Sequence, residues 1–268
     1  MLWEIAKSVV RRAPLIALDY KVDPTPRWGF GKPTHPQLEA LMAKGEPGYR
    51  KLLESFEEFR EDFLAIDQIS EDPTQPSRTN GFFAGLDALS LYSFLRQRQP
   101  KTYIEIGSGH STRFASRAIR DAGSDTKIIS IDPHPRVEMD GLSDKIVRRP
   151  LENVDQEIFK VLEPGDILFF DGSHYALPNS DVVAFFLEVM PSLPKGVLIH
   201  VHDIRLPYDY PPKLNRHWFG EQYILAMYLL STPDPKVVLP NYWIWEQPEL
   251  KAMWDDICIG GNSFWYET

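Results

Sequence analysis

The sequence predicts an α/β fold in which helices cover both faces of a mostly parallel, seven-stranded sheet. Three observations support this. From residue 101 onward, short apolar runs alternate with segments of helical spacing. The runs are apolar on both faces, as in parallel strands that are buried on both sides. The pattern differs at the end of the chain, where the last two runs are expected as strands and an antiparallel C-terminal strand is expected.

The elements follow in a regular order. A helix is expected over Gly85–Arg98, just before Pro100. Beyond it, helices are expected over Ser111–Ala122, Asp181–Met190 and Gln222–Leu230. The expected strands are Thr102–Ile106, Lys127–Ile131, Lys145–Arg149, Asp166–Phe170, Val197–Val201, Lys236–Trp245 and Ser263–Glu267.

Residues 1–80 differ from the rest and are expected to form an N-terminal helical extension or cap on a domain spanning residues 81–268. Helical spacing runs through Leu38–Met42 and Tyr49–Ile66. One face of the second segment carries Leu52, Leu53, Phe56, Phe59 and Phe63. These side chains predict a helix that packs on the main domain, with a lid over a substrate site as the functional alternative.

Composition excludes several classes of function. The formal net charge of −9 argues against binding to nucleic acid or to an anionic membrane surface. No apolar run approaches the ~18 residues of a membrane span. Cys258 is the only cysteine, so an internal disulfide and a multi-cysteine zinc site are both ruled out. A single cysteine suits a reducing compartment, and we expect a cytoplasmic protein.

The most informative segment joins the first strand to its helix and reads Glu105-Ile106-Gly107-Ser108-Gly109-His110-Ser111. Glycines allow a tight turn and close approach to a ligand, and the helix N-terminus offers free N–H groups. Glu105 ends the strand, where a carboxylate suits an amine-bearing ligand and repels a pyrophosphate. Thr112 stands where a dinucleotide fingerprint has its third glycine. Both points favour S-adenosylmethionine over NAD.

Asp132 ends the second strand, and an acid at this place can accept hydrogen bonds from both hydroxyls of a ribose. A turn or cap role for Asp132 is the alternative. The predicted cofactor-binding set is completed by Asp171, at the end of the fourth strand, and comprises Glu105, Gly107, Ser108, Gly109, Ser111, Asp132 and Asp171.

With these residues, the chain resembles the class I S-adenosylmethionine-dependent methyltransferases, whose first motif has the form acid-x-Gly-x-Gly-x-Gly. Ser111 replaces the last glycine. The resemblance covers residues 81–268 and implies a Rossmann-like fold. Two segments, Phe169–Tyr175 and His200–Ile204, resemble the bacterial macrocin- and catechol-type O-methyltransferases. This implies O-methylation of a small polar, sugar-like or natural-product acceptor.

Acidic and imidazole side chains gather where the fourth and fifth strands end. Asp171 and Asp203 should converge there, close to His174 and His202. Two carboxylates can be held together by Mg²⁺, which would lower the pKa of an acceptor hydroxyl. In a metal-free site, His174 or His202 would be the base, oriented by Asp171 or Asp203. His200 is expected to be a core residue. The loop Arg205–Pro211 is expected to form a wall of the substrate site.

The predicted partner is a small-molecule acceptor, and a homo-oligomer is compatible with the sequence. Three other classes of function remain open. One is an NAD-type oxidoreductase on a similar sheet. Another is a metal-dependent hydroxylase or hydrolase that uses Asp171, His174 and Asp203. The third is a ligand-binding module without catalytic activity.

Overall fold

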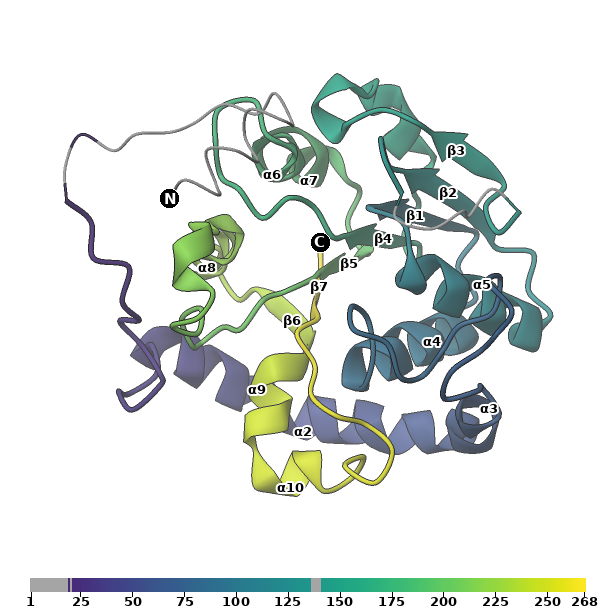
Figure 1. Cartoon of the computed structure of the whole chain (residues 1–268), viewed down its shortest axis with the longest axis horizontal. Helices are drawn as coiled ribbons and strands as arrows, with labels where there is room; N and C mark the ends of the chain where they lie inside the picture. The colour runs from purple at the N-terminus through teal and green to yellow at the C-terminus, as the bar shows by residue number, and fades with distance from the viewer. Residues whose placement is uncertain (1–18, 20, 136–140) are drawn as a thin grey trace.

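A computed structural model describes residue 19 and residues 21–135 and 141–268. The first eighteen residues of the predicted extension lie outside these ranges. The described chain contains one sheet of seven strands in the order β3-β2-β1-β4-β5-β7-β6 (Figure 1). All neighbours are parallel except β7, which pairs antiparallel with β5 and β6. The predicted fold class is thereby confirmed. The strands are β1 Thr102–Ile106, β2 Lys127–Ile131, β3 Lys145–Val147, β4 Ile167–Phe170, β5 Leu198–Val201, β6 Lys236–Pro240 and β7 Phe264–Glu267.

Helices cover the sheet on both sides. In Figure 1, α4 and α5 lie below the central strands, whereas α6 and α7 lie above them. The helices are α2 Pro36–Ser55, α3 Arg60–Leu64, α4 Leu86–Arg98, α5 His110–Ala122, α6 Asp181–Ala184, α7 Met190–Ser192, α8 Glu221–Ser231, α9 Asn241–Glu246 and α10 Pro248–Lys251. Because helices shield both faces, β4 and β5 are buried at every position.

Several expected elements differ in the structure. The strand expected over Lys236–Trp245 ends at Pro240, and Asn241 begins α9. Its side chain donates to Asp87 Oδ1 at 2.9 Å and to Ser90 Oγ at 3.1 Å, which binds the chain to α4 and ends the pairing. The helix expected over Asp181–Met190 widens into a π-helical turn over Phe185–Val189. The two helical segments expected before residue 66 are joined, because α2 runs through Pro47.

The segment before α2 is bound to the loop that follows β5. Asp209 N–H donates to Trp28 O at 3.1 Å, and Arg27 N–H donates to Asp209 Oδ2 at 2.9 Å. A third bond joins His35 N–H to Pro207 O at 3.1 Å. α2 itself lies against β6 and α8 (Figure 1). Within the described ranges, no helix combines the length and the apolar character needed to cross a bilayer.

Candidate active site

A cavity of about 1140 Å³ opens at the carboxyl ends of β1, β2, β4 and β5. This is the edge at which parallel α/β sheets bind their ligands. The cavity brings together most of the side chains that the sequence singled out. Its lining includes Gly107, Gly109, Asp132, Asp171, His174 and Asp203.

The glycine turn forms one wall of the cavity. Gly107 has a φ of +83°, and a Cβ there would lie 2.1 Å from Asp171 O, so a side chain would collide with the end of β4. Gly109 is different, because a Cβ at this position would meet no atom within 4 Å. Its φ of 168° is ordinary extended backbone. The turn therefore leaves open space at Gly109, directly before the N-terminus of α5, where a ligand can approach the backbone.

Glu105 does not reach this cavity, which corrects the expectation that it meets the ligand directly. Its side chain is fully buried, and its Oε1 accepts hydrogen bonds from Thr112 Oγ1 and Ser130 Oγ, both at 2.6 Å. Burial raises the pKa of Glu105 to about 7, although these hydroxyl donors counteract part of the rise. Thr112 also accepts from Gly109 N–H at 3.0 Å. The acid and Thr112 thus hold the turn in shape from beneath.

Asp132 lines the cavity at the end of β2 and also supports the turn. Its Oδ2 accepts from Ser108 N–H at 2.8 Å and from Ser108 Oγ at 3.1 Å, and its Oδ1 accepts from His134 N–H at 2.8 Å. The turn role that the sequence left as an alternative is therefore present in the structure. Because a carboxylate oxygen can accept more than one hydrogen bond, the same side chain can still receive a ligand hydroxyl.

His174 lies between three carboxylates. Its Nδ1 is 2.7 Å from Glu221 Oε2 on α8, and its Nε2 lies 3.7 Å from Asp171 Oδ1 and 3.6 Å from Asp203 Oδ2. Burial lowers the pKa of this imidazole, but Glu221, Asp171 and Asp203 together outweigh that effect and raise the pKa to about 9. Burial raises the pKa of Glu221 to about 7, although the hydrogen bond and the charge of His174 counteract part of the rise.

The backbone is strained where these side chains enter the cavity. His174 has a φ of +65° and Asp203 a φ of +56°, in the left-handed region that residues with a side chain rarely adopt. Such conformations cost about 1–3 kcal/mol each and cluster at functional sites. In Asp203, this conformation occurs two residues after the end of β5.

His200 on β5 and His202 just beyond its end lie deeper. His200 is fully buried, stacks on Phe169 at 4.0 Å between ring centroids, and contacts Ser263 Oγ through Nε2 at 2.7 Å. It packs in the core, as expected. The side chain of His202 is only 6 % exposed and lies between Asp171 and Asp87. Burial alone would lower the pKa of His202, but Asp171 and Asp203 raise it well above its usual value.

The arrangement does not fit a magnesium ion. The predicted ligands Asp171 and Asp203 both face His174 Nε2, so an imidazole that carries positive charge occupies the position between them. In the part of the chain that the structure describes, no group of three or more histidine, cysteine, aspartate or glutamate side chains is arranged to hold a metal. The imidazole therefore supplies the positive charge that two converging carboxylates require.

Two residues of this site were not recognised from the sequence in the roles they occupy. Glu221 is fully buried beneath His174, a position that its place in the sequence did not indicate. Asp87 was not considered, although it is 3 % exposed and lies 3.4 Å from His202. The sequence did contain a signal for Asp87, because it is the single acidic residue in the largely apolar run Leu86–Leu95. A buried acid needs a partner.

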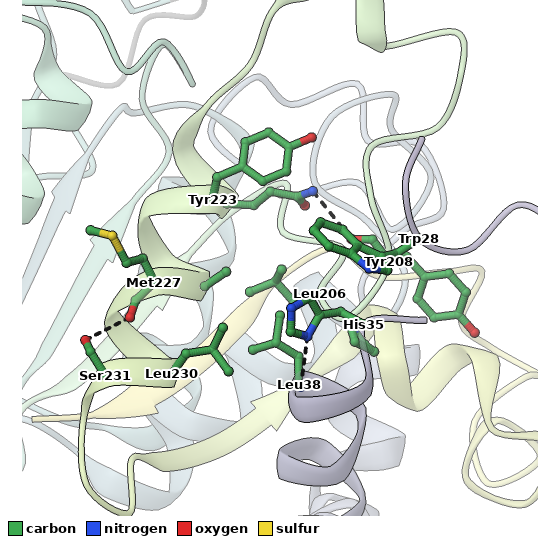
Figure 2. A pocket seen from close by; sticks show the side chains of 12 residues that line it. Trp28, His35, Leu38, Leu206, Tyr208, Tyr223, Met227, Leu230 and Ser231 are labelled. Carbon is green, nitrogen blue, oxygen red and sulfur yellow. Dashed lines mark hydrogen bonds between the residues drawn. The ribbon is translucent and has the colours of Figure 1, made fainter. Parts of the chain in front are cut away.

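The loop after β5 forms a wall, but it faces two cavities. Arg205 lines the main cavity, whereas Leu206, Pro207 and Tyr208 line a second pocket of about 400 Å³. Figure 2 shows this second pocket between the start of α2 and the face of α8 that carries Met227 and Leu230. Among the residues that the structure describes, no aspartate, glutamate, lysine or arginine side chain lines this pocket, and its lining includes the imidazole of His35.

Comparison with known proteins gives one family match. Residues 104–204 match the model of a family described as a methyltransferase domain. This segment contains the glycine turn, Asp132, Asp171, His174 and Asp203. An uncharacterised protein from Archaeoglobus fulgidus is 30 % identical over 92 residues, which cover 32 % of this chain and 42 % of that relative. The match thus spans less than half of the relative's length.

Solved structures show more distant likenesses. A methyltransferase from Podospora anserina with bound S-adenosylhomocysteine is 18 % identical, with 78 % of this chain and 92 % of that chain covered and a TM-score of 0.39. The O-methyltransferase TomG from Streptomyces achromogenes, in complex with S-adenosylmethionine, is 16 % identical, with 81 % and 88 % covered and a TM-score of 0.40. Likenesses of this size do not bear on the activity of the present chain.

Proposed function

We propose that the chain is an S-adenosylmethionine-dependent O-methyltransferase that acts on a small polar acceptor without a metal ion. The observation that carries the proposal is the shared cavity. It joins the glycine turn and Asp132 to His174 and Asp203, within the segment that matches a methyltransferase domain. An acceptor from the sugar-like or natural-product class is supported by the resemblance of Phe169–Tyr175 and His200–Ile204 to macrocin- and catechol-type enzymes.

The cofactor would lie over the glycine turn. Open space at Gly109 and the start of α5 admit its polar tail, and Asp132 would accept hydrogen bonds from its ribose hydroxyls. S-adenosylmethionine would supply an electrophilic methyl group. Holding the acceptor in line with that group is most of what the protein has to do. The role of Glu105 is indirect, because it maintains the shape of the turn.

His174 is the proposed general base. Its Nδ1 is held by Glu221, which leaves Nε2 at the cavity to take the proton of an acceptor hydroxyl. Asp171 and Asp203 would stabilise the imidazolium that results, since each lies within 4 Å of Nε2. His202 is not proposed as a base, because it is buried between two carboxylates.

A titration of S-adenosylmethionine followed by calorimetry tests the proposed site. The wild-type chain should bind one equivalent. Gly109→Leu should reduce affinity at least tenfold, because a Cβ at this position meets no atom within 4 Å and the larger side chain would extend into the open space. Gly48→Leu is the matched control: its Cβ also meets no atom within 4 Å, but it lies in α2, outside the cavity lining. An absence of binding by the wild type, or equal binding by Gly109→Leu, would contradict the proposal.

A further inference from the structure

We infer that Asp87 is a positioning residue for this site: through the buried His202, it holds the carboxylate of Asp171 at the cavity. The inference rests on the proposed function. Asp87 belongs to α4, which precedes the segment matched by the methyltransferase family. A helix outside that segment would then help to shape the site.

The three side chains form a line from the core to the cavity. Asp87 Oδ2 lies 3.4 Å from His202 Nε2, and His202 Nδ1 lies 3.6 Å from Asp171 Oδ1. Exposure increases along this line. The side chains of Asp87 and His202 are 4 % and 6 % exposed, whereas that of Asp171 is 38 % exposed. The buried pair therefore ends in a carboxylate that a ligand can reach.

Asp87 is itself held firmly, so it can serve as an anchor. Its Oδ1 accepts from Ser263 N–H at 2.7 Å and from the Asn241 side chain at 2.9 Å. Asn262 N–H donates to both carboxylate oxygens at 2.8 Å. Asn262 lines the main cavity, so Asp87 also positions a second part of its wall.

Charge explains why the line depends on Asp87. A buried imidazolium between two carboxylates is compensated on both sides, and a buried charge that loses one partner is strongly disfavoured. Without the negative charge of Asp87, His202 would give up its proton or shift toward Asp171. In either case, the Asp171 carboxylate would lose the fixed partner that orients it. Asp171 also lies 3.7 Å from His174 Nε2, so the disturbance would extend to the proposed base.

The test measures the affinity for S-adenosylmethionine in Asp87→Asn, a substitution of nearly equal size. We expect the dissociation constant to rise about tenfold, equivalent to about 1.4 kcal/mol. Asp166→Asn is the matched control. Asp166 is also a buried acid, 2 % exposed, that accepts from backbone N–H groups of Thr102 and Glu163, but it does not line the cavity. Both variants should melt at lower temperatures than the wild type, and only Asp87→Asn should bind less tightly.

A double-mutant cycle with Asp171→Asn separates positioning from a general structural role. Because Asp171 belongs to the predicted cofactor-binding set and lines the cavity, Asp171→Asn should weaken binding by itself. Asp87→Asn should then add less than about twofold, because its effect acts through Asp171. If Asp87→Asn does not fold, His202→Gln removes the imidazole between Asp87 and Asp171 and should weaken binding in the same way. The inference would be overturned if Asp87→Asn bound S-adenosylmethionine as tightly as the wild type. It would also be overturned if Asp87→Asn reduced the affinity equally in the wild type and in Asp171→Asn. Failure of the wild type to bind at all would instead contradict the proposed function.

Discussion

At the scale of single residues, the site is defined by how its acids and imidazoles share charge. His174 has its Nδ1 fixed by Glu221 and its Nε2 at the cavity, near two further carboxylates. The raised pKa that results means that His174 is protonated at neutral pH. A protonated imidazole cannot accept a proton, so the proposed activity should increase with pH as the pH approaches 9.

The first prediction concerns the pKa of His174, which can be measured by a histidine NMR titration without knowing the acceptor. In the wild type, His174 should titrate near pH 9. In Glu221→Gln, the pKa should fall toward the ordinary value of about 6.5, because the carboxylate that favours the charged imidazole is gone. Activity that depends on neutral His174 should then begin at lower pH.

A control variant shows whether this change is specific. Glu152→Gln also removes a carboxylate from the cavity lining, but the carboxylates paired with His174 are those of Glu221, Asp171 and Asp203. The pKa of His174 should therefore stay where it is. A wild-type His174 that titrates below pH 7, or one that Glu221→Gln leaves unchanged, would contradict the proposed pairing.

The sequence predicted which residues gather at the cavity better than it predicted their roles. Asp132, Asp171, His174 and Asp203 all line it, because the ends of parallel strands meet at one edge. Glu105 was misplaced because the side chain at a strand end points to one face or the other, and here hydroxyl donors hold it beneath the turn. Contacts such as that of Asp87 with His202 join distant positions, which spacing along the chain does not reveal.

At the scale of elements, the N-terminal segment braces the loop after β5. Asp209 is central to this contact. It receives the Arg27 N–H and the hydroxyl of Tyr223 from α8, and its own N–H donates to Trp28. Trp28, Tyr208 and Tyr223 surround the second pocket that is drawn in Figure 2.

The second prediction is that Asp209→Ala destabilises the fold and spares the cofactor site. Asp209 is 4 % exposed, and its removal leaves the N–H of the buried Tyr210 without its acceptor. It also breaks the hydrogen bonds from Arg27 N–H and from the Tyr223 hydroxyl. We expect the free energy of unfolding in urea to fall by about 1–3 kcal/mol. The affinity for S-adenosylmethionine should be unchanged, because Asp209 does not line the main cavity. The prediction would be refuted if Asp209→Ala unfolded at the same urea concentration as the wild type. It would also be refuted if the variant lost much of its affinity for S-adenosylmethionine.

The sequence predicted the type of an element correctly where the element is buried on both faces. β4 and β5 were expected because continuous apolar runs indicate strands covered on both faces. The run Tyr242–Trp245 has the same apolar character, yet it forms α9 because Asn241 is bound to α4 rather than to a neighbouring strand. An apolar run of this length does not by itself distinguish a strand from a buried helix.

At the scale of the whole molecule, segments far apart in the chain converge on one sheet edge. The glycine turn follows β1, Asp132 follows β2, His174 follows β4 and Asp203 follows β5. α8 contributes Glu221, and α4 contributes Asp87. The second pocket lies on the other side of the loop that contains Arg205 and Tyr208. A ligand that enters one cavity should therefore leave the other exposed.

Hydrogen exchange measured by mass spectrometry tests the central claim most directly. We expect S-adenosylhomocysteine, added in the presence of EDTA, to slow exchange in peptides that cover residues 104–112 and 130–135. Peptides from α2 and from residues 223–231 of α8 should exchange as before. Protection of those α8 and α2 peptides instead, or no protection unless Mg²⁺ is added, would contradict a metal-independent cofactor site at the turn between β1 and α5.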